Sequence, residues 1–162
     1  MDGHLGELLN RFSKAGKVEW IGVRPGRREP MVALTSVDVE LSGLVGDRRA
    51  APGKRAVTLL QQEHLSVIAS LADLDVVDPR QLRRNILVSG INLLALRNKD
   101  FQIGELELRG SGLCAPCSRM EEELGNGGYN AMRGHGGITA SVIVPGRIRT
   151  GNQVTASSEQ SK

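Results

Sequence analysis

The sequence predicts one domain of mainly β structure with small helices, closed into a barrel. Three observations favour this fold class. Apolar residues fall in many short runs, several of them alternating with polar residues, as in strands with one buried face. Segments with helical spacing are few and short. No regular alternation of strand and helix indicates a doubly wound parallel sheet, so a β-rich barrel is expected.

The first half of the chain begins with a short amphipathic segment. Leu5, Leu8, Leu9 and Phe12 recur at helical spacing and predict a helix near 4–15 that ends at about Gly16. Strands bounded by turn residues follow. We expect them at 18–23, at 31–41, where apolar and polar residues alternate, and at 56–60, with a loop over 43–49.

The second half contains two further short helices and most of the remaining strands. Apolar spacing predicts a helix within 61–71, and Asp78-Pro79 begins the next one, because proline suits a first helical turn. The later strands are expected at 85–89, 100–103, 105–109, 138–144, 147–150 and 153–156. Residues 1–16 are therefore predicted to be a helical extension, 17–156 a single domain and 157–162 a disordered tail.

Composition excludes several classes of function. One Trp, one Tyr and two Phe are too few to stack the bases of a single-stranded nucleic acid. The net charge of +3 comes mainly from arginines, which are scattered in pairs, so DNA binding is not expected either. No segment approaches the roughly 20 apolar residues of a membrane span, and there is no signal peptide. We expect a cytoplasmic protein whose two cysteines do not form a structural disulfide.

Both cysteines, Cys114 and Cys117, lie in one short segment. Pro116 suits the first position of a helix, so Cys117 is expected in the first turn, where the helix dipole favours a thiolate. Met120 and Leu124 would face the core. A small buried cysteine, a C-x-x-C redox pair and a zinc site are the alternatives. The last two are weaker, because the motif comes late in the chain and the three histidines lack ligand spacing.

A glycine-dense tract at 125–137 is the second candidate site. Its glycines permit successive N–H groups to face an anion, and Arg133 stands among them, so we expect a pocket for a phosphorylated ligand. Two plain turns would give the same pattern. The basic pairs at 48–49, 54–55 and 83–84 either contact an anion or form salt bridges. Arg84 and Asn85 precede an apolar strand, where buried side chains would have to find partners.

Several motifs together resemble the small stand-alone bacterial MOSC-domain proteins. They are APCSRMEE at 115–122 and GGYNAMRGHGGI at 127–138, with GLVGDR at 43–48, RNILVSGINL at 84–93 and further matches at 101–104 and 146–152. The resemblance covers about 18–156 in the family's motif order. The family is named after the C-terminal domain of molybdenum-cofactor sulfurases. It implies a β-barrel of the pyruvate-kinase-insert type.

The resemblance also implies a pyranopterin molybdenum cofactor and a reactive cysteine that carries sulfur or ligates molybdenum. By motif alignment that cysteine is Cys117, whereas Cys114 is matched less regularly. The implied residues around the pterin and its phosphate are Arg48, Arg83, Arg84, Asn85, Ser118, Arg119, Asn130, Arg133, Gly134, His135, Gly136 and Gly137. Pyridoxal phosphate, which the sulfurases carry in a separate domain, is not expected, because the lysines lie mostly in polar turns.

Three hypotheses of function remain open. The first is a molybdenum-dependent oxidoreductase or sulfur transferase, which would reduce N-hydroxylated compounds or pass on sulfur with an electron-transfer or sulfur-donor protein. The second is a non-catalytic module that binds and delivers the cofactor, because the partner domain of larger molybdenum enzymes is missing. The third is a thiol–disulfide redox protein. Relatives often have a histidine soon after Gly46-Asp47, where this chain has Arg48-Arg49. The sequence indicates neither the substrate nor the oligomeric state.

Overall fold

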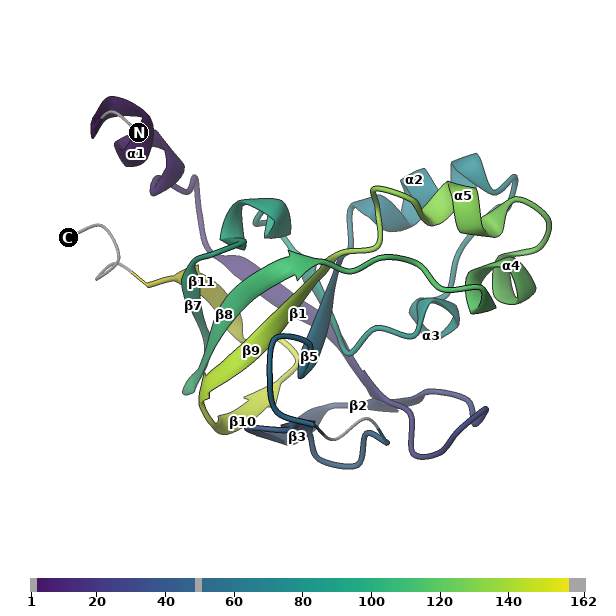
Figure 1. Ribbon diagram of the computed structural model, residues 1–162, viewed down its shortest axis with the longest axis horizontal. Helices are drawn as coiled ribbons and strands as arrows, with labels where there is room; N and C mark the ends of the chain where they lie inside the picture. The colour runs from purple at the N-terminus through teal and green to yellow at the C-terminus, as the bar shows by residue number, and fades with distance from the viewer. Residues whose placement is uncertain (1–2, 49–50, 158–162) are drawn as a thin grey trace.

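The computed structural model describes residues 3–48 and 51–157, and the predicted tail falls mostly on residues outside these ranges. Within them, seven strands close into a barrel, because the last strand pairs with the first through Gly16 opposite Val154. Figure 1 shows this barrel with four short helices gathered at one end and the N-terminal helix on the opposite side. The strands in barrel order are β1 (Gly16–Val23), β6 (Ile86–Ser89), β5 (Val57–Gln61), β9 (Ile138–Val144), β8 (Leu106–Leu113), β7 (Asp100–Ile103) and β11 (Gln153–Ala156).

Smaller elements surround the barrel. Strand β2 (Val32–Leu34) pairs with β1, and a separate three-stranded sheet contains β10 (Gly146–Arg149), β3 (Ser36–Glu40) and β4 (Gly43–Leu44). The helices are α1 (Gly3–Leu9), α2 (His64–Leu71), α3 (Pro79–Leu82), α4 (Arg119–Leu124), α5 (Gly128–Met132) and the 3₁₀ turn η1 (Leu93–Leu96). Helix α4 contacts both α3 and α5, and α5 contacts α2, so these four form one helical layer.

The core is divided by strands β5 and β6, which are buried on both faces. Leu59 and Ile86 belong to the cluster inside the barrel, which also holds the fully buried Phe101. Their chain neighbours Leu60 and Leu87 belong to a second cluster beneath the helical layer. This division follows from the strand geometry, because successive side chains point to opposite faces of a sheet.

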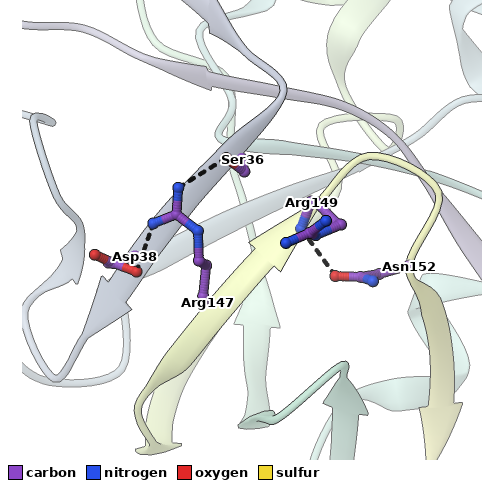
Figure 2. A network of polar contacts seen from close by, with 5 residues as sticks. All are labelled: Ser36, Asp38, Arg147, Arg149 and Asn152. Atoms are coloured by element: carbon purple, nitrogen blue, oxygen red, sulfur yellow. Dashed lines mark hydrogen bonds and ion pairs between the residues drawn. The ribbon is translucent and has the colours of Figure 1, made fainter.

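Polar contacts connect the small sheet across β3 and β10. Arg147 donates hydrogen bonds to Asp38 Oδ1 at 2.8 Å and to Ser36 Oγ at 2.9 Å, so its guanidinium spans two residues of the neighbouring strand. The backbone N–H of Arg149 donates to Asn152 Oδ1 at 2.8 Å in the turn that leads to β11. Figure 2 shows both sets of contacts. These exposed contacts set the register of the pair rather than contribute much stability.

The predicted fold class, mainly β with small helices, is confirmed, and most predicted strands lie within a few residues of the observed ones. Three predictions about local structure were wrong. The alternating run 31–41 divides into β2 and β3, which join different sheets. Strands β5 and β6 are parallel and connected through α2 and α3, a βαβ unit that the sequence did not reveal. The expected helix at 4–15 is limited to Gly3–Leu9, with its leucines exposed.

No helix in the described part of the chain has the length and apolar character needed to cross a bilayer.

Gly137 allows β9 to approach β5 closely, because it has no Cβ atom. Its φ is +85°, and a Cβ atom there would overlap the Leu59 carbonyl oxygen and lie 3.0 Å from the Leu60 Cα. Gly134 has the same φ but open space around it. We expect Gly134→Ala to lower the free energy of unfolding by about 1 kcal/mol, the cost of a left-handed alanine. Gly137→Ala should cost about 1–3 kcal/mol more, because backbone atoms must also move.

Urea unfolding of both variants and the parent measures the difference directly. Equal destabilisation by the two substitutions would contradict the close approach of β9 to β5.

Candidate functional site

The segment that carries the cysteines separates two cavities. It leaves β8 and runs toward α4, and its first pairing is the hydrogen bond from Cys114 N to the Gly137 carbonyl at 2.9 Å. On one side lies a cavity of about 150 Å³, which we call the arginine cavity. On the other side lies a cavity of about 450 Å³, which we call the apolar cavity. Cys114 and Ala115 line both, so this wall is a single stretch of chain.

Cys117 lies in the arginine cavity with its side chain exposed, whereas Cys114 is buried. The prediction that Cys117 occupies the first helical turn was wrong. Helix α4 begins at Arg119 with Ser118 as its N-cap, and Cys117 precedes the cap. The chain needs residues 114–117 to pass from the barrel to the helical layer, so the helix starts later than Pro116 suggested. The positive charge near Cys117 therefore comes from arginine side chains.

Arg24 and Arg83 supply most of the unsatisfied polar atoms of the arginine cavity. Each has a buried Nε with no hydrogen-bond partner among the described residues. Burial lowers the pKa of the Arg24 guanidinium, and the nearby Arg83 and Arg48 lower it further. Burial also lowers the pKa of Arg83, with a further decrease from Arg119, while Glu123 and the Cys117 thiol act in the opposite direction. Guanidinium groups held together against their repulsion make a site that favours an anion.

A second depression of about 280 Å³ adjoins the arginine cavity and shares Arg24 with it. Its other basic side chains belong to Arg27, Arg28, Arg48 and Arg119. Arg119 forms a half-exposed ion pair with Glu122 at 3.5 Å, which offsets part of this charge. Arg28 has a φ of +64°, a conformation that non-glycine residues rarely adopt. The turn after β1 therefore adds three arginines to the site.

Arg84 is buried and connects three segments around the site. Its Nε donates to the Gly136 carbonyl at 2.8 Å, and its terminal nitrogens donate to Leu82 O at 3.0 Å and Ala115 O at 3.3 Å. The guanidinium thus holds the end of α3, the cysteine segment and the glycine loop at fixed separations. Because each of its three nitrogens donates to a backbone carbonyl, Arg84 is a positioning residue for the cavity wall.

Asn85 plays a similar part on the other side of the arginine cavity. Its Oδ1 accepts from Thr58 N at 3.1 Å, and its Nδ2 donates to Gly22 O at 3.2 Å and Asp47 Oδ2 at 3.4 Å. The other oxygen of Asp47 accepts the backbone N–H of Arg24 at 2.9 Å. The amide and the carboxylate therefore fix the turn that carries Arg24.

The glycine tract contains the short helix α5, with a turn on either side of it. The Glu121 carboxylate accepts the Gly127 N–H at 2.8 Å and the Tyr129 N–H at 3.0 Å. These hydrogen bonds lower the pKa of the Glu121 carboxyl, the one from Gly127 most strongly. Two of the N–H groups that the sequence offered to a bound anion, those of Gly127 and Tyr129, are thus occupied by a side chain of α4.

The residues implied by the resemblance divide between the two sides of the cysteine segment. Arg83, Arg84, Asn85 and Cys117 line the arginine cavity, and Arg48, Ser118 and Arg119 line the adjoining depression. Arg133, Gly134, Gly136 and Gly137 line the apolar cavity. Asn130 accepts a long hydrogen bond from Arg133 at 3.5 Å, and His135 packs edge-on against His64. The sequence did not indicate Arg24, Arg27 and Arg28 as site residues, although they follow directly after a buried strand. Arg55 was expected only as part of the basic pair 54–55, and Asp47 only as part of the motif at 43–48.

Comparison with known proteins gives a family and a fold. The MOSC domain family model matches residues 33–155. The YuaD protein of Bacillus subtilis superposes with a TM-score of 0.79 at 18% identity, covering 90% of this chain and 98% of that one. The YiiM proteins of Escherichia coli and Geobacillus stearothermophilus give 0.68 at 21% identity and 0.70 at 15%. They cover 90% and 88% of this chain, and 70% and 75% of their own. No curated protein matches.

Replacing Arg84 should loosen the wall between the cavities. Arg84→Met keeps most of the volume but leaves the carbonyls of Leu82, Ala115 and Gly136 without this donor, so we expect a loss of about 3 kcal/mol in the free energy of unfolding. Arg80→Met, an exposed position on α3, should change it by less than about 0.5 kcal/mol. Chemical denaturation compares the two variants, and similar values for both would contradict the role given to Arg84.

The Glu121 hydrogen bonds predict a pH-dependent contribution to stability. The folded-state pKa of this carboxyl is depressed, so its contribution is present above the ordinary pKa and disappears as the pH falls through the folded value. Glu121→Gln should therefore melt at a lower temperature than the parent at pH 7. The difference should shrink in acid and vanish once the pH lies below the depressed folded-state pKa, where the parent carboxyl is also neutral. Thermal melts of Glu121→Gln and a matched Glu122→Gln control over this range test it, and a pH-independent difference would contradict it.

Proposed function

This chain belongs to the MOSC-domain family, and we propose that it binds the pyranopterin molybdenum cofactor in the arginine cavity. In this proposal the Cys117 thiolate ligates molybdenum or carries sulfur beside it. One observation carries the proposal: an exposed thiol shares a cavity with two arginines whose buried Nε atoms have no partner among the described residues. A soft donor next to a cluster of guanidinium groups fits a metal cofactor that has a phosphate group.

The charge of the site supports this assignment. Arg24, Arg48, Arg83 and Arg119 lie close enough to lower the pKa values of Arg24 and Arg83 by mutual repulsion. A phosphate group would relieve this repulsion and accept forked hydrogen bonds from the guanidinium groups. The buried Nε donors suit such a ligand, because the free protein leaves them unpaired at a cost.

In this proposal each side chain of the site has a separate role in binding the cofactor. Cys117 supplies the sulfur, and the arginines hold the anionic end of the cofactor. Arg84 keeps the cysteine segment at a fixed distance from α3, while Asp47 and Asn85 hold the turn that carries Arg24. When bound, the cofactor supplies two-electron redox chemistry, which suits the reduction of N-hydroxylated compounds with electrons from a partner protein. A module that only delivers the cofactor would use the same contacts and show no turnover.

Metal analysis tests the proposal. The protein should be purified from molybdate-supplemented cells, with molybdenum measured per chain and the pterin measured by fluorescence after oxidation. We expect Cys117→Ser to contain at least about 10-fold less molybdenum per chain than the parent. The double variant Arg24→Gln/Arg83→Gln should contain about 10–100-fold less of both molybdenum and pterin. Arg97→Gln, an exposed arginine outside the arginine cavity, is the matched control and should retain both.

Negligible molybdenum and pterin in the parent and in Cys117→Ser alike would overturn the proposal. A defined reduction potential for a Cys114–Cys117 disulfide, measured in glutathione buffers, would then favour the thiol redox alternative.

A further inference from the structure

The larger cavity, on the far side of the cysteine segment, has a different chemistry from the arginine cavity. Its volume of about 450 Å³ lies in the range of small-molecule sites. Leu93, Leu94, Leu113 and Ile138 make up much of its wall. We propose that it is a second binding site, for an amphipathic organic monoanion: an apolar or aromatic body that carries one carboxylate or sulfonate group. This site does not depend on the molybdenum cofactor.

Exposed apolar side chains at the cavity account for the apolar part of the ligand. Leu94 is 54% exposed, Leu113 55% and Tyr129 40%, and all three line the same cavity. Large apolar side chains left in contact with water around one concave site are typical of a ligand-binding surface. Covering them with an apolar or aromatic body would remove this surface from water, which is favourable at about 25 cal/mol per Å².

Arg133 would bind the anionic group of the ligand. It lines the cavity and takes no part in the ion pairs found among residues 3–48 and 51–157. Its side chain makes only a long hydrogen bond, 3.5 Å, to Asn130 Oδ1. A guanidinium without a carboxylate partner, at a site with apolar walls, can hold a carboxylate or sulfonate through a fork of N–H donors.

The two amide side chains of the cavity hydrogen-bond to its own wall. Gln61 Oε1 accepts the Leu93 N–H at 2.9 Å, and Gln61 Nε2 donates to the Ile91 carbonyl at 2.9 Å. Asn92 Oδ1 accepts the Leu94 N–H at 3.2 Å. These amides fix the wall and leave Arg133 as the charged group that is free to meet a ligand.

His64 does not add a second cation to the cavity. His64 lines the cavity, and its ring meets that of His135 edge-on with centroids 5.2 Å apart. Burial lowers the pKa of His64, and His135 lowers it further, so His64 is mainly neutral at pH 7. The cavity therefore presents one positive charge and apolar walls. A phosphate dianion is better matched by the several arginines on the other side of the cysteine segment.

The probe for this site is 8-anilinonaphthalene-1-sulfonate, an aromatic monoanion whose fluorescence rises when its rings leave water. With the folded parent protein we expect saturable binding at one site, with native circular dichroism throughout. Leu113→Asp places a negative charge at the apolar wall, and Arg133→Gln removes the cation. Each should weaken binding by at least about 10-fold, and neither should unfold the protein, because both positions are exposed.

Matched controls separate this cavity from other surfaces. Ile143→Asp changes an exposed apolar residue of β9 outside the cavity, and Arg97→Gln removes an exposed arginine elsewhere. Both should bind the probe like the parent, as should Arg24→Gln/Arg83→Gln, whose arginines lie in the arginine cavity. 4-Phenylbutyrate should displace the probe and shift the backbone amide signals of Gly134 and Gly136. Absence of saturable binding, or equal binding by the parent, Leu113→Asp and Arg133→Gln, would overturn the proposal.

Discussion

The buried guanidinium of Arg84 is the interaction on which the arrangement of both cavities depends. It donates to the carbonyls of Leu82, Ala115 and Gly136, which belong to three different segments. Arginine suits this position because its five N–H donors lie in one rigid plane and can reach several acceptors at once. Burying a charge is costly, and here carbonyl dipoles rather than a carboxylate compensate for it. Together with the hydrogen bond from Cys114 N to the Gly137 carbonyl, they hold the cysteine segment against the glycine loop.

The concentration of positive charge in the arginine cavity lowers the stability of the fold. Arg24 and Arg83 are partly buried beside other guanidinium groups, and each leaves a buried Nε without a partner among the described residues. A site designed only for stability would pair or expose these groups. Asp47 does not neutralise them fully, because its oxygens accept the Arg24 N–H and the Asn85 amide. The unfavourable contacts of the free protein are those that an anionic ligand would replace with favourable ones.

The barrel could be predicted from the sequence because most strands are short, apolar and bounded by turn residues. The site could be predicted only in part. Local patterns in the sequence indicated Cys117 and Arg83 as site residues. The turn after β1 brings Arg24 into the same cavity, and no local pattern indicates this position for Arg24. The hydrogen bond from Gly127 N–H to the Glu121 carboxylate, six residues away, is likewise evident only in the folded chain. Long-range contacts also decide two features of the sheets that the local alternation of apolar and polar residues does not indicate. They divide 31–41 between two sheets and pair β5 with β6 in parallel.

The thin wall between the cavities gives the two sites a physical connection. Gly136 is packed so closely that a Cβ atom would overlap the Cys114 carbonyl oxygen and lie 3.2 Å from an Arg84 terminal nitrogen. The wall at this point therefore consists of backbone, and no side chain separates a ligand in the apolar cavity from Cys114 and Ala115. A ligand that moved this backbone would strain the Arg84 hydrogen bonds and displace the segment that carries Cys117. The two cavities differ in the charge of their linings, yet they share the wall formed by Cys114 and Ala115, in the same segment as Cys117.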